Sequence, residues 1–245
     1  MAAGKAGPVI SIRPLSEPGE FREVVRLQQE IWGFSAEDAL PVRLFVVARK
    51  IGGQIFGAFD GERMIGFCVS LPGLRHGGGN YLHSNMLGVE EGYRDRGIGR
   101  MLKLAQRDDA LSRGIGLIEW TFDPLEIKNA YFNMERLGAV VRRYVLNQYG
   151  VTSSALHGGL PTDRCVAEWH LTSARVTAAL RGQPVPRPPI EERIEVPLAS
   201  SEPRREIQKR VSDRFLECLG RGLTVVGVEK SAASGAYLLG HWEPE

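Results

Sequence analysis

Cysteine and histidine are scarce in this sequence, and their spacing excludes several classes of site. The chain has three cysteines, Cys68, Cys165 and Cys218, an odd number spread far apart. This spacing provides neither a disulfide framework nor the close cysteine pairs of a zinc site. The five histidines are scattered as well, and no His-x-x-x-His pair occurs. We therefore expect no metal, and the reducing cytoplasm as the location.

Long apolar runs and an excess of one charge are also missing. No apolar run reaches the roughly 18 residues of a membrane helix, and the first residues lack the apolar core of a secretory signal. Lys+Arg 31 against Asp+Glu 29 gives a net charge of +2, too small to attract a membrane or nucleic acid. Arg142-Arg143 is too short a basic patch for nucleic acid. The 43% hydrophobic and 24% charged residues indicate an ordinary globular protein.

One stretch combines a strand pattern, a polar turn and a helix opened by glycines. It runs from His83 to Arg100 and reads HSNMLGVEEGYRDRGIGR. Within it, Arg94, Gly97 and Gly99 fit the pattern Arg/Gln-x-x-Gly-x-Gly/Ala. Glycine lets the backbone approach a ligand closely, and a helix N-terminus offers unpaired N–H groups that suit a phosphate. The stretch therefore predicts a strand that leads into a diphosphate cradle.

Two other glycine-rich motifs do not fit this stretch. The dinucleotide fingerprint Gly-x-Gly-x-x-Gly fails because Leu102 stands at the third glycine position. The phosphate loop of nucleotide hydrolases fails because no Gly-Lys-Ser/Thr follows. A tight turn before an amphipathic helix remains as the alternative, and a lone glycine pair would favour it. The flanking residues favour a ligand site.

The whole stretch resembles the acetyl-CoA-binding motif of the GNAT acyltransferase superfamily. Two downstream segments, Leu117–Leu125 and Asn133–Ala139, look like the next strand and the following helix of that superfamily. The resemblance covers about residues 9–172, and it looks closest to a branch with an added C-terminal segment. It implies an α/β fold of the GNAT type, with a mixed central sheet flanked by helices and a small α+β extension.

Hydrophobic periodicity independently predicts alternating strands and helices. Alternation of apolar and polar residues indicates a strand, a spacing of three or four indicates a helix, and Asp60-Gly61 is a strong hairpin signal. We expect strands at 9–13, 54–59, 64–71, 81–89, 115–123, 139–149 and 164–171, and helices at about 18–33, 41–50, 97–113, 125–137 and 173–180. This order is typical of an α/β fold with mixed strand directions.

The expected domain organisation has three parts. Residues 1–172 form the acyltransferase domain, 173–189 form a proline-rich and extended connection, and 190–245 form the extension. The extension has fewer than ~70 residues, too few for a comfortable core of its own. We therefore expect it to pack on the main domain or on a partner subunit, with a homodimer as one option.

The extension should contain one amphipathic helix among its strands. Strands are expected at 193–197, 223–228 and 236–242. Between the first two, Ser201 is expected to cap a helix. One face of this helix carries apolar residues at near-helical spacing, namely Ile207, Val211, Phe215 and Leu219.

The resemblance implies acetyl-CoA as acyl donor and an amine, of a small molecule or a peptide, as acceptor. The strand segment Leu87-Gly88-Val89 would supply backbone N–H groups for the developing oxyanion. Asn129 would lie near the pantetheine arm. The amides that would hold the diphosphate belong to Arg94, Asp95, Arg96, Gly97, Ile98, Gly99 and Arg100.

The candidates for proton transfer are His83, Glu119 and Tyr131. His83 has an ordinary pKa near ~6.5 that suits a base, although a lone strand histidine is more often structural. Many GNAT enzymes carry a tyrosine four residues before the glycine that ends the helix after this strand. Here that glycine looks like Gly138, and the position holds Met134. Tyr131, one helical turn earlier, is the nearest replacement, with packing in the core as its alternative.

Glu119 shares one face of its strand with Thr121 and Asp123, because alternate residues of a strand point the same way. Either carboxylate suits a base that meets the acceptor. Asp123-Pro124 has a second interpretation, as the start of the following helix.

Two functions remain open on the sequence alone. The first is an N-acetyltransferase in which the amine attacks the thioester directly, because Cys68 lies in an apolar strand and suits the core better than an acyl-cysteine stage. The second is a non-catalytic module that binds CoA or acyl-CoA as a ligand, which Met134 favours.

Overall fold

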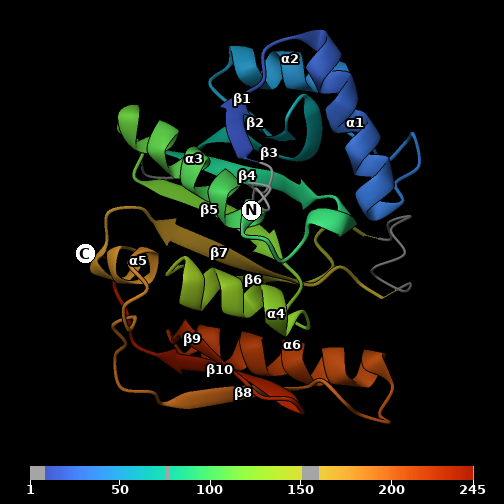
Figure 1. Cartoon of the computed structure of the whole chain (residues 1–245). Helices are drawn as coiled ribbons and strands as arrows, with labels where there is room; N and C mark the ends of the chain where they lie inside the picture. Colours follow the sequence, from blue (N-terminus) through green and yellow to red (C-terminus); the bar gives the residue numbers. More distant parts are fainter. Residues whose placement is uncertain (1–8, 76–77, 151–159, 245) are drawn as a thin grey trace, which may run out of the picture. The chain divides into compact units, whose positions relative to one another are not determined.

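The computed structural model describes residues 9–75, 78–150 and 160–244 (Figure 1). The chain divides into two compact units, the first running to Ile115 and the second starting at Gly116. Each unit has its own antiparallel strands and its own helices.

The first unit contains four strands and three α-helices among its described residues. In chain order these are β1 (Ile10–Pro14), α1 (Pro18–Trp32), α2 (Val42–Lys50), β2 (Gln54–Asp60), β3 (Arg63–Leu74), β4 (Asn80–Val89), the short 3-10 helix η1 (Glu91–Tyr93) and α3 (Ile98–Ser112). The strand order is β1-β2-β3-β4, and every neighbouring pair is antiparallel. The predicted hairpin is present, with Gly61 in the left-handed region at a φ of 61°.

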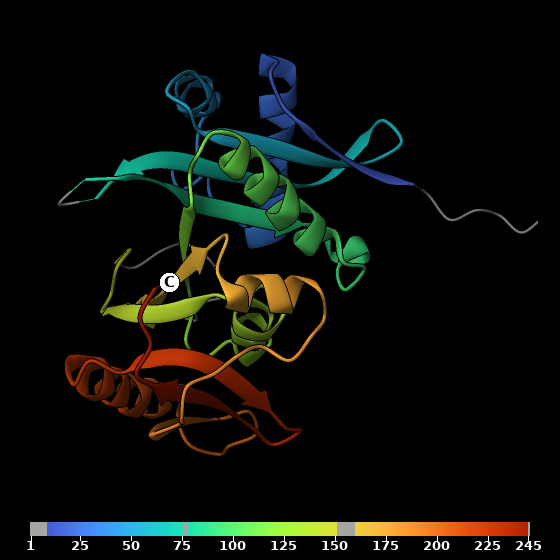
Figure 2. The same cartoon turned by 90° about the vertical axis from the view of Figure 1, so that its left-hand side faces the viewer.

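Helices cover both faces of this four-stranded sheet (Figure 2), and an apolar cluster lies beneath them on each face. On one face, α1 and α2 pack Phe21 and Phe45 against Phe67 of β3. On the other face, α3 packs Leu102 against Cys68 of the same strand. The sheet therefore lies between two layers of helix, and Cys68 is a core residue, as predicted.

Strand β4 contains a one-residue bulge. Met86 and Ser84 pair with consecutive residues of β3, so Asn85 between them is an extra residue. An extra residue reverses the alternation of side chains along a strand. Ser84 accordingly faces α3 before the bulge, and Leu87 faces α3 after it.

The second unit contains six strands among its described residues. Its elements are β5 (Leu117–Phe122), α4 (Ile127–Tyr131), the π-helical turn η2 (Phe132–Arg136), β6 (Val140–Val145), β7 (Arg164–His170), α5 (Ala174–Leu180), β8 (Glu192–Pro197), α6 (Arg204–Gly220), β9 (Thr224–Lys230) and β10 (Ser234–Gly240). The strand order is β5-β7-β6-β9-β10-β8, with antiparallel neighbours throughout.

The C-terminal strands continue this order from β6 outward (Figure 1). Val141 of β6 pairs with Val225 of β9. The Tyr237 hydroxyl of β10 donates to the carbonyl oxygen of Pro124 at 2.6 Å. Residues 190–245 are thus joined to residues 116–172 by both strand pairing and a buried hydrogen bond, and α6 packs on β6 as well as on β8.

Two predicted elements are shorter or less regular than expected. The helix expected over 125–137 is an α-helix only over Ile127–Tyr131 and continues as a π-turn, in which the Leu137 N–H reaches the Phe132 carbonyl oxygen at 3.1 Å. The strand expected over 139–149 ends at Val145. A Cβ at Gly138 would lie 2.8 Å from the carbonyl oxygen of Arg175 in α5, so the residue after this helix must be a glycine.

The prediction that Ser201 caps the C-terminal helix was wrong. Helix α6 begins at Arg204, with Pro203 at the N-cap position and no side-chain cap. The fixed φ of proline suits the entry to a helix without a capping side chain. The fourth residue of the apolar face is Cys218, which is buried, in place of Leu219; the others are Ile207, Val211 and Phe215, as predicted.

Candidate functional site

The turn between β4 and α3 has the backbone form that the sequence predicts for a diphosphate cradle. Asp95 and Gly97 both lie in the left-handed region, with φ of 63° and 79°. Left-handed residues in a turn direct successive N–H groups into a concavity that binds anions. Helix α3 starts at the next residue, Ile98, and Gly97 at its N-cap provides no side-chain cap.

The space in front of this helix start is open. A Cβ at Gly97 would meet no atom within 4 Å, and a Cβ at Gly99 would meet only the Leu87 side chain at 3.6 Å, an ordinary contact. Packing within the protein therefore does not require glycine at position 99. A helix N-terminus with no side-chain cap and no Cβ in front of it fits a bound phosphate group.

Polar contacts hold the turn in place. The Tyr93 hydroxyl donates to Asp60 Oδ2 at 2.7 Å, and this hydrogen bond raises the pKa of Tyr93. Arg94 Nε donates to the Val89 carbonyl oxygen at 3.2 Å, and the guanidinium of Arg96 lies 5.1 Å from the centre of the Tyr93 ring. Both arginines are exposed beside the open amides, where a cation favours an anionic ligand.

The strand segment Leu87-Gly88-Val89 follows the bulge directly. A Cβ at Gly88 would lie 2.8 Å from the side chains of both Ile31 and Trp32, so the close approach of α1 requires a glycine here. Gly88 consequently has a packing role in addition to the amide role that the sequence suggests.

His83 lies two residues before the bulge, half-buried and paired with Leu71 of β3. Because neighbouring residues of a strand point to opposite faces, His83 is on the face opposite Ser84. Farther along β4, that face is covered by Trp32, which stacks on Phe34 at 5.6 Å and meets Phe67 edge-on at 5.8 Å.

The sequence analysis missed a group of polar side chains on the buried face of α3. Lys103 is only 4% exposed, and its Nζ donates to Ser84 Oγ at 2.8 Å. Ser84 Oγ donates in turn to Gln106 Oε1 at 3.1 Å. Burial lowers the pKa of Lys103 to about 7. The sequence does contain a sign of this buried group, because a lysine and a glutamine three residues apart interrupt the apolar face of the helix.

In the second unit, Glu119 belongs to a buried cluster of charged side chains. Its carboxylate is nearly inaccessible and lies 2.7 Å from Arg143. Glu168 stands directly opposite on β7 and contacts Arg142 at 2.5 Å and Arg143 at 3.4 Å. Burial favours the neutral acid, but hydrogen bonds from His170 and Arg142 outweigh it and lower the pKa of Glu168 to about 2.

Asp123 closes the end of β5. Its Oδ1 accepts the N–H of Leu125 at 2.8 Å, which supports the interpretation that Asp123 starts the following helical segment. Burial raises the pKa of this carboxyl above its ordinary value.

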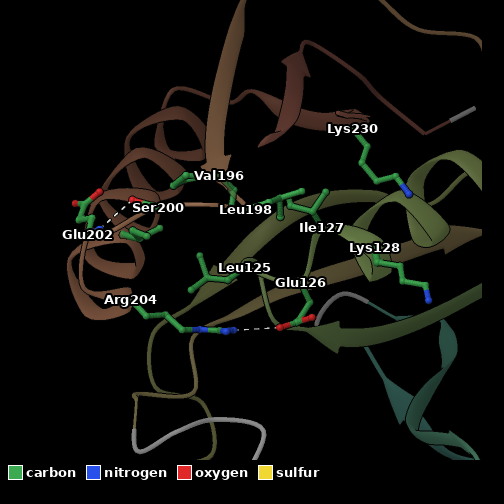
Figure 3. A pocket seen from close by; sticks show the side chains of 12 residues that line it. Leu125, Glu126, Ile127, Lys128, Val196, Leu198, Ser200, Glu202, Arg204 and Lys230 are labelled. Atoms are coloured by element: carbon green, nitrogen blue, oxygen red, sulfur yellow. Dashed lines mark hydrogen bonds and ion pairs between the residues drawn. The ribbon is translucent and has the colours of Figure 1, made fainter. Parts of the chain in front are cut away.

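A pocket of about 410 Å³ opens beside the start of α4 (Figure 3). Ile127 lies in its middle, and Lys128 and Lys230 stand together at one side. Arg204 closes another side through an ion pair with Glu126 at 3.1 Å. The remaining lining residues come from the turn after β5 and from the extension: Leu125, Val196, Pro197, Leu198, Ser200, Glu202 and Ile207. The extension therefore shapes the surface around the start of α4.

Comparison with known proteins decides the family. Residues 21–138 match the model of the acetyltransferase (GNAT) family. This part of the chain is a GNAT acetyltransferase domain. The match supports the prediction of an enzyme of the acetyltransferase class. No curated protein matches the chain by sequence.

Several solved GNAT structures have the same fold. NAA60 of Arabidopsis thaliana in complex with acetyl-CoA has a TM-score of 0.53 at 16% identity, over 66% of this chain and 99% of its own. The ribosomal-protein-S18-alanine N-acetyltransferase of Escherichia coli has a TM-score of 0.53 at 16% identity, over 68% and 96%. Arabidopsis thaliana Naa50 in complex with a bisubstrate analogue has a TM-score of 0.51 at 16% identity, over 65% and 97%. The predicted α/β fold of the GNAT type is confirmed.

The GNAT tyrosine position is occupied by a buried side chain in this protein. Met134 is fully buried in the π-turn after α4. Tyr131, one turn earlier, is half-buried, and its ring centre lies 5.9 Å from the guanidinium of Arg136 and 5.4 Å from the ammonium of Lys230. Asn129 is exposed in the first turn of α4.

The described residues lack two further features. None of the helices in this part of the chain is both long and apolar enough to cross a membrane. No group of three or more His, Cys, Asp or Glu side chains among these residues is arranged to hold a metal ion.

Proposed function

We propose that this GNAT protein transfers an acetyl group from acetyl-CoA to an amine. The observation that carries the proposal is the open, left-handed turn at Asp95 and Gly97 before the uncapped start of α3. CoA contains a diphosphate, which is the kind of group that such a helix start binds. The Arabidopsis NAA60 structure contains acetyl-CoA, which supports the same donor here.

In the proposed reaction the amine nitrogen attacks the thioester carbon directly. The new C–N bond forms, the carbonyl oxygen takes up negative charge, and the C–S bond then breaks to release the CoA thiolate. Backbone N–H groups of Leu87–Val89 would stabilise the oxyanion. Their place immediately after the bulge at Asn85 supports this role, because bulges are over-represented next to active sites.

Proton transfer is assigned to His83 and Tyr131. His83 would take the proton of the amine, directly or through a water molecule. Tyr131 would donate to the thiolate, whose ordinary pKa near ~8.5 makes it a tolerable leaving group without a strong acid. Glu119 is a weaker candidate for the base, because Arg143 holds its carboxylate.

An acyl-cysteine stage is not part of this proposal. Cys68 is fully buried, and burial raises the pKa of its thiol to about 12, so the nucleophilic thiolate does not form near neutral pH.

We propose a primary amine of a peptide or of a small molecule as the acceptor. The E. coli protein that shares this fold is named as an N-acetyltransferase of an alanine in a ribosomal protein, and the Naa50 structure contains a bisubstrate analogue of CoA and the peptide MVNAL. In the same proposal, residues 1–172 carry the activity, 173–189 connect, and 190–245 pack on the main domain.

The experiment that tests the proposal is CoA calorimetry with two matched glycine variants. Gly99 and Gly19 each occupy the second position of a 15-residue helix, and neither is crowded. Gly99→Val should abolish CoA binding, whereas Gly19→Val should leave it unchanged. Unchanged CoA affinity in a folded Gly99→Val protein would refute the cradle.

The second candidate function is a CoA-binding module without catalysis. It is favoured by the buried Met134 at the position where many GNAT enzymes have a tyrosine. Turnover of acetyl-CoA with a library of peptide and small-molecule amines separates the two functions. Tight CoA binding without turnover of any amine would establish the second.

A further inference from the structure

The buried polar group beneath α3 is built around the bulge of β4. Ser70 of β3 and Ser84 of β4 are paired with each other immediately beside the extra residue, Asn85. Both serine side chains point to the face that α3 covers, and both are buried. Hydroxyl groups therefore stand on both strands at the one place where the ladder is irregular.

Each of these hydroxyl groups is connected to α3. Ser84 Oγ accepts from Lys103 Nζ at 2.8 Å and donates to Gln106 Oε1 at 3.1 Å. Ser70 Oγ donates to Gln54 Oε1 at 2.7 Å, and Gln54 Nε2 donates to the Gln106 carbonyl oxygen at 2.8 Å. Gln106 is consequently connected to both serines, directly to Ser84 and through Gln54 to Ser70.

Burial of a lysine at this position costs free energy that a purely structural contact does not require. Lys103 is 4% exposed, and removing an ammonium group from water is unfavourable unless other groups compensate. Leucine or methionine would fill the same space between α3 and the sheet without that cost. What lysine adds is a hydrogen bond that reaches across to one hydroxyl, on the residue just before the bulge.

The helix that carries Lys103 is the helix whose first turn forms the proposed diphosphate cradle. Gly97 at the N-cap and Lys103 are less than two turns apart on a rigid α-helix. The segment after the bulge, Leu87–Val89, is the strand proposed to face the thioester. The contact from Lys103 to Ser84 thus joins the two parts of the backbone that must address opposite ends of one ligand.

From this geometry we infer that Lys103 is a positioning residue, which clamps α3 to the bulged segment of β4 and fixes the cradle relative to the thioester-facing backbone. The inference rests on the proposed function for its catalytic consequence, and on the described contacts alone for the clamp. Lys103 touches neither donor nor acceptor in this scheme.

The clamp should respond to pH, because an ammonium donates a stronger, charge-assisted hydrogen bond to the Ser84 hydroxyl than a neutral amine does. Burial lowers the pKa of Lys103 to about 7, and the group facing it from β3, Cys68, has a pKa raised to about 12 and remains neutral there. From β4 it meets the neutral hydroxyl of Ser84. An ionisation near neutral pH should therefore be visible in the wild-type protein.

The test compares three variants of the full chain without ligand, by amide hydrogen exchange. Lys103→Met removes the amine, Ser84→Ala removes only the hydroxyl that it contacts, and Leu102→Met is a matched, volume-conserving change of the neighbouring buried residue on α3. Loss of a hydrogen bond to a charged or polar partner should reduce the protection of amides 84–89 by roughly ten- to a hundred-fold in the first two variants. Leu102→Met should retain it.

Kinetics then test the catalytic consequence. In Lys103→Met the CoA dissociation constant should stay within about three-fold of wild type, because the cradle is backbone, whereas kcat should fall about ten-fold or more. The pH profile of kcat should differ between wild type and this variant, because Lys103 no longer contributes an ionisation near neutral pH. If Lys103→Met does not fold, the same measurements on Ser84→Ala, which removes a single buried oxygen, test the clamp.

The possible outcomes are distinguishable. Equal exchange rates of amides 84–89 in Lys103→Met, Ser84→Ala and Leu102→Met would overturn the clamp, whatever the activity of these variants. A wild-type protein that binds no CoA would refute the proposed function and leave the exchange result to decide the clamp. Faster exchange with an unchanged kcat and pH profile would overturn the catalytic role.

Discussion

Replacing Lys103 with methionine should stabilise the protein, and the gain should shrink as the pH rises. Burial lowers the pKa of this amine from 10.5 to about 7. Between these values the unfolded chain binds a proton that the native protein does not bind. By linkage, the stability of the wild type must then rise with pH through this window. Methionine has no proton to bind, so the variant lacks this rise.

The magnitude follows from the pKa difference of about 3.5 between the two states. At about 1.4 kcal/mol for each pKa unit, burying the charged amine costs about 5 kcal/mol below neutral pH. Methionine is flexible and fills the same space, but the hydrogen bond to Ser84 is lost, at about 1–2 kcal/mol. The expected net gain is about 3 kcal/mol near pH 6. At about pH 9 most of the burial cost of the wild-type amine is already relieved, so the gain should be close to zero.

Urea unfolding followed by circular dichroism, at several values between about pH 6 and pH 9, measures this difference. Lys128→Met is the matched control, because it makes the same change at an exposed lysine of α4. Parallel stability curves for wild type and Lys103→Met across this range would refute the reasoning. Lys103→Met should unfold at a higher urea concentration than wild type but exchange amides 84–89 faster. That combination would show that the local clamp and the global stability are separate properties.

Three further outcomes are expected. Cys68→Ala should keep turnover within about three-fold, and intact-mass analysis during turnover should show no acyl adduct on the wild-type chain, since the buried thiol stays protonated. Gly88→Ala should lower stability by about 1–3 kcal/mol, because its Cβ would lie 2.8 Å from Trp32, whereas the uncrowded control Gly116→Ala should melt close to wild type. Residues 183–245 expressed alone should show no cooperative melting transition; a stable folded monomer would contradict this.

The elements that were predicted correctly are those fixed by local chemistry. Gly61 and Gly97 both lie in the left-handed region, which few residues other than glycine adopt without strain, so the hairpin and the start of α3 could be placed from sequence. The GNAT fold could be predicted for the same reason, because the residues of its ligand-binding turn lie within one short stretch of the sequence.

The elements that were missed depend on contacts between distant segments. Asn85 is an extra residue only in relation to β3, and no glycine or proline marks the bulge. A lysine in a helix sequence usually indicates a residue exposed to solvent. Only the packing of α3 on β4 shows that the amine of Lys103 is buried. Likewise, the backbone of Arg175, from a distant segment of the chain, lies against Gly138 at the end of this helix.

Site assignments that need several segments at once remain predictions. Asn129 and Tyr131 were placed by resemblance, and only the immediate surroundings of each are fixed by α4 and its neighbours in the second unit. Acceptor choice depends on side chains that converge from many loops, which periodicity and spacing do not reveal.

Because of the bulge, the number of residues in β4 determines which face of the sheet each of its side chains takes. Removing Asn85 would restore regular alternation and turn the preceding residues through half a rotation about the strand. His83 would then be directed toward the layer of α3, and the hydroxyl of Ser84 toward the layer of α1. A single-residue deletion here would therefore exchange the occupants of two layers without altering any other residue. In an alignment of relatives, a gap within β4 would mark a larger change in the protein than most replacements of the residues around it.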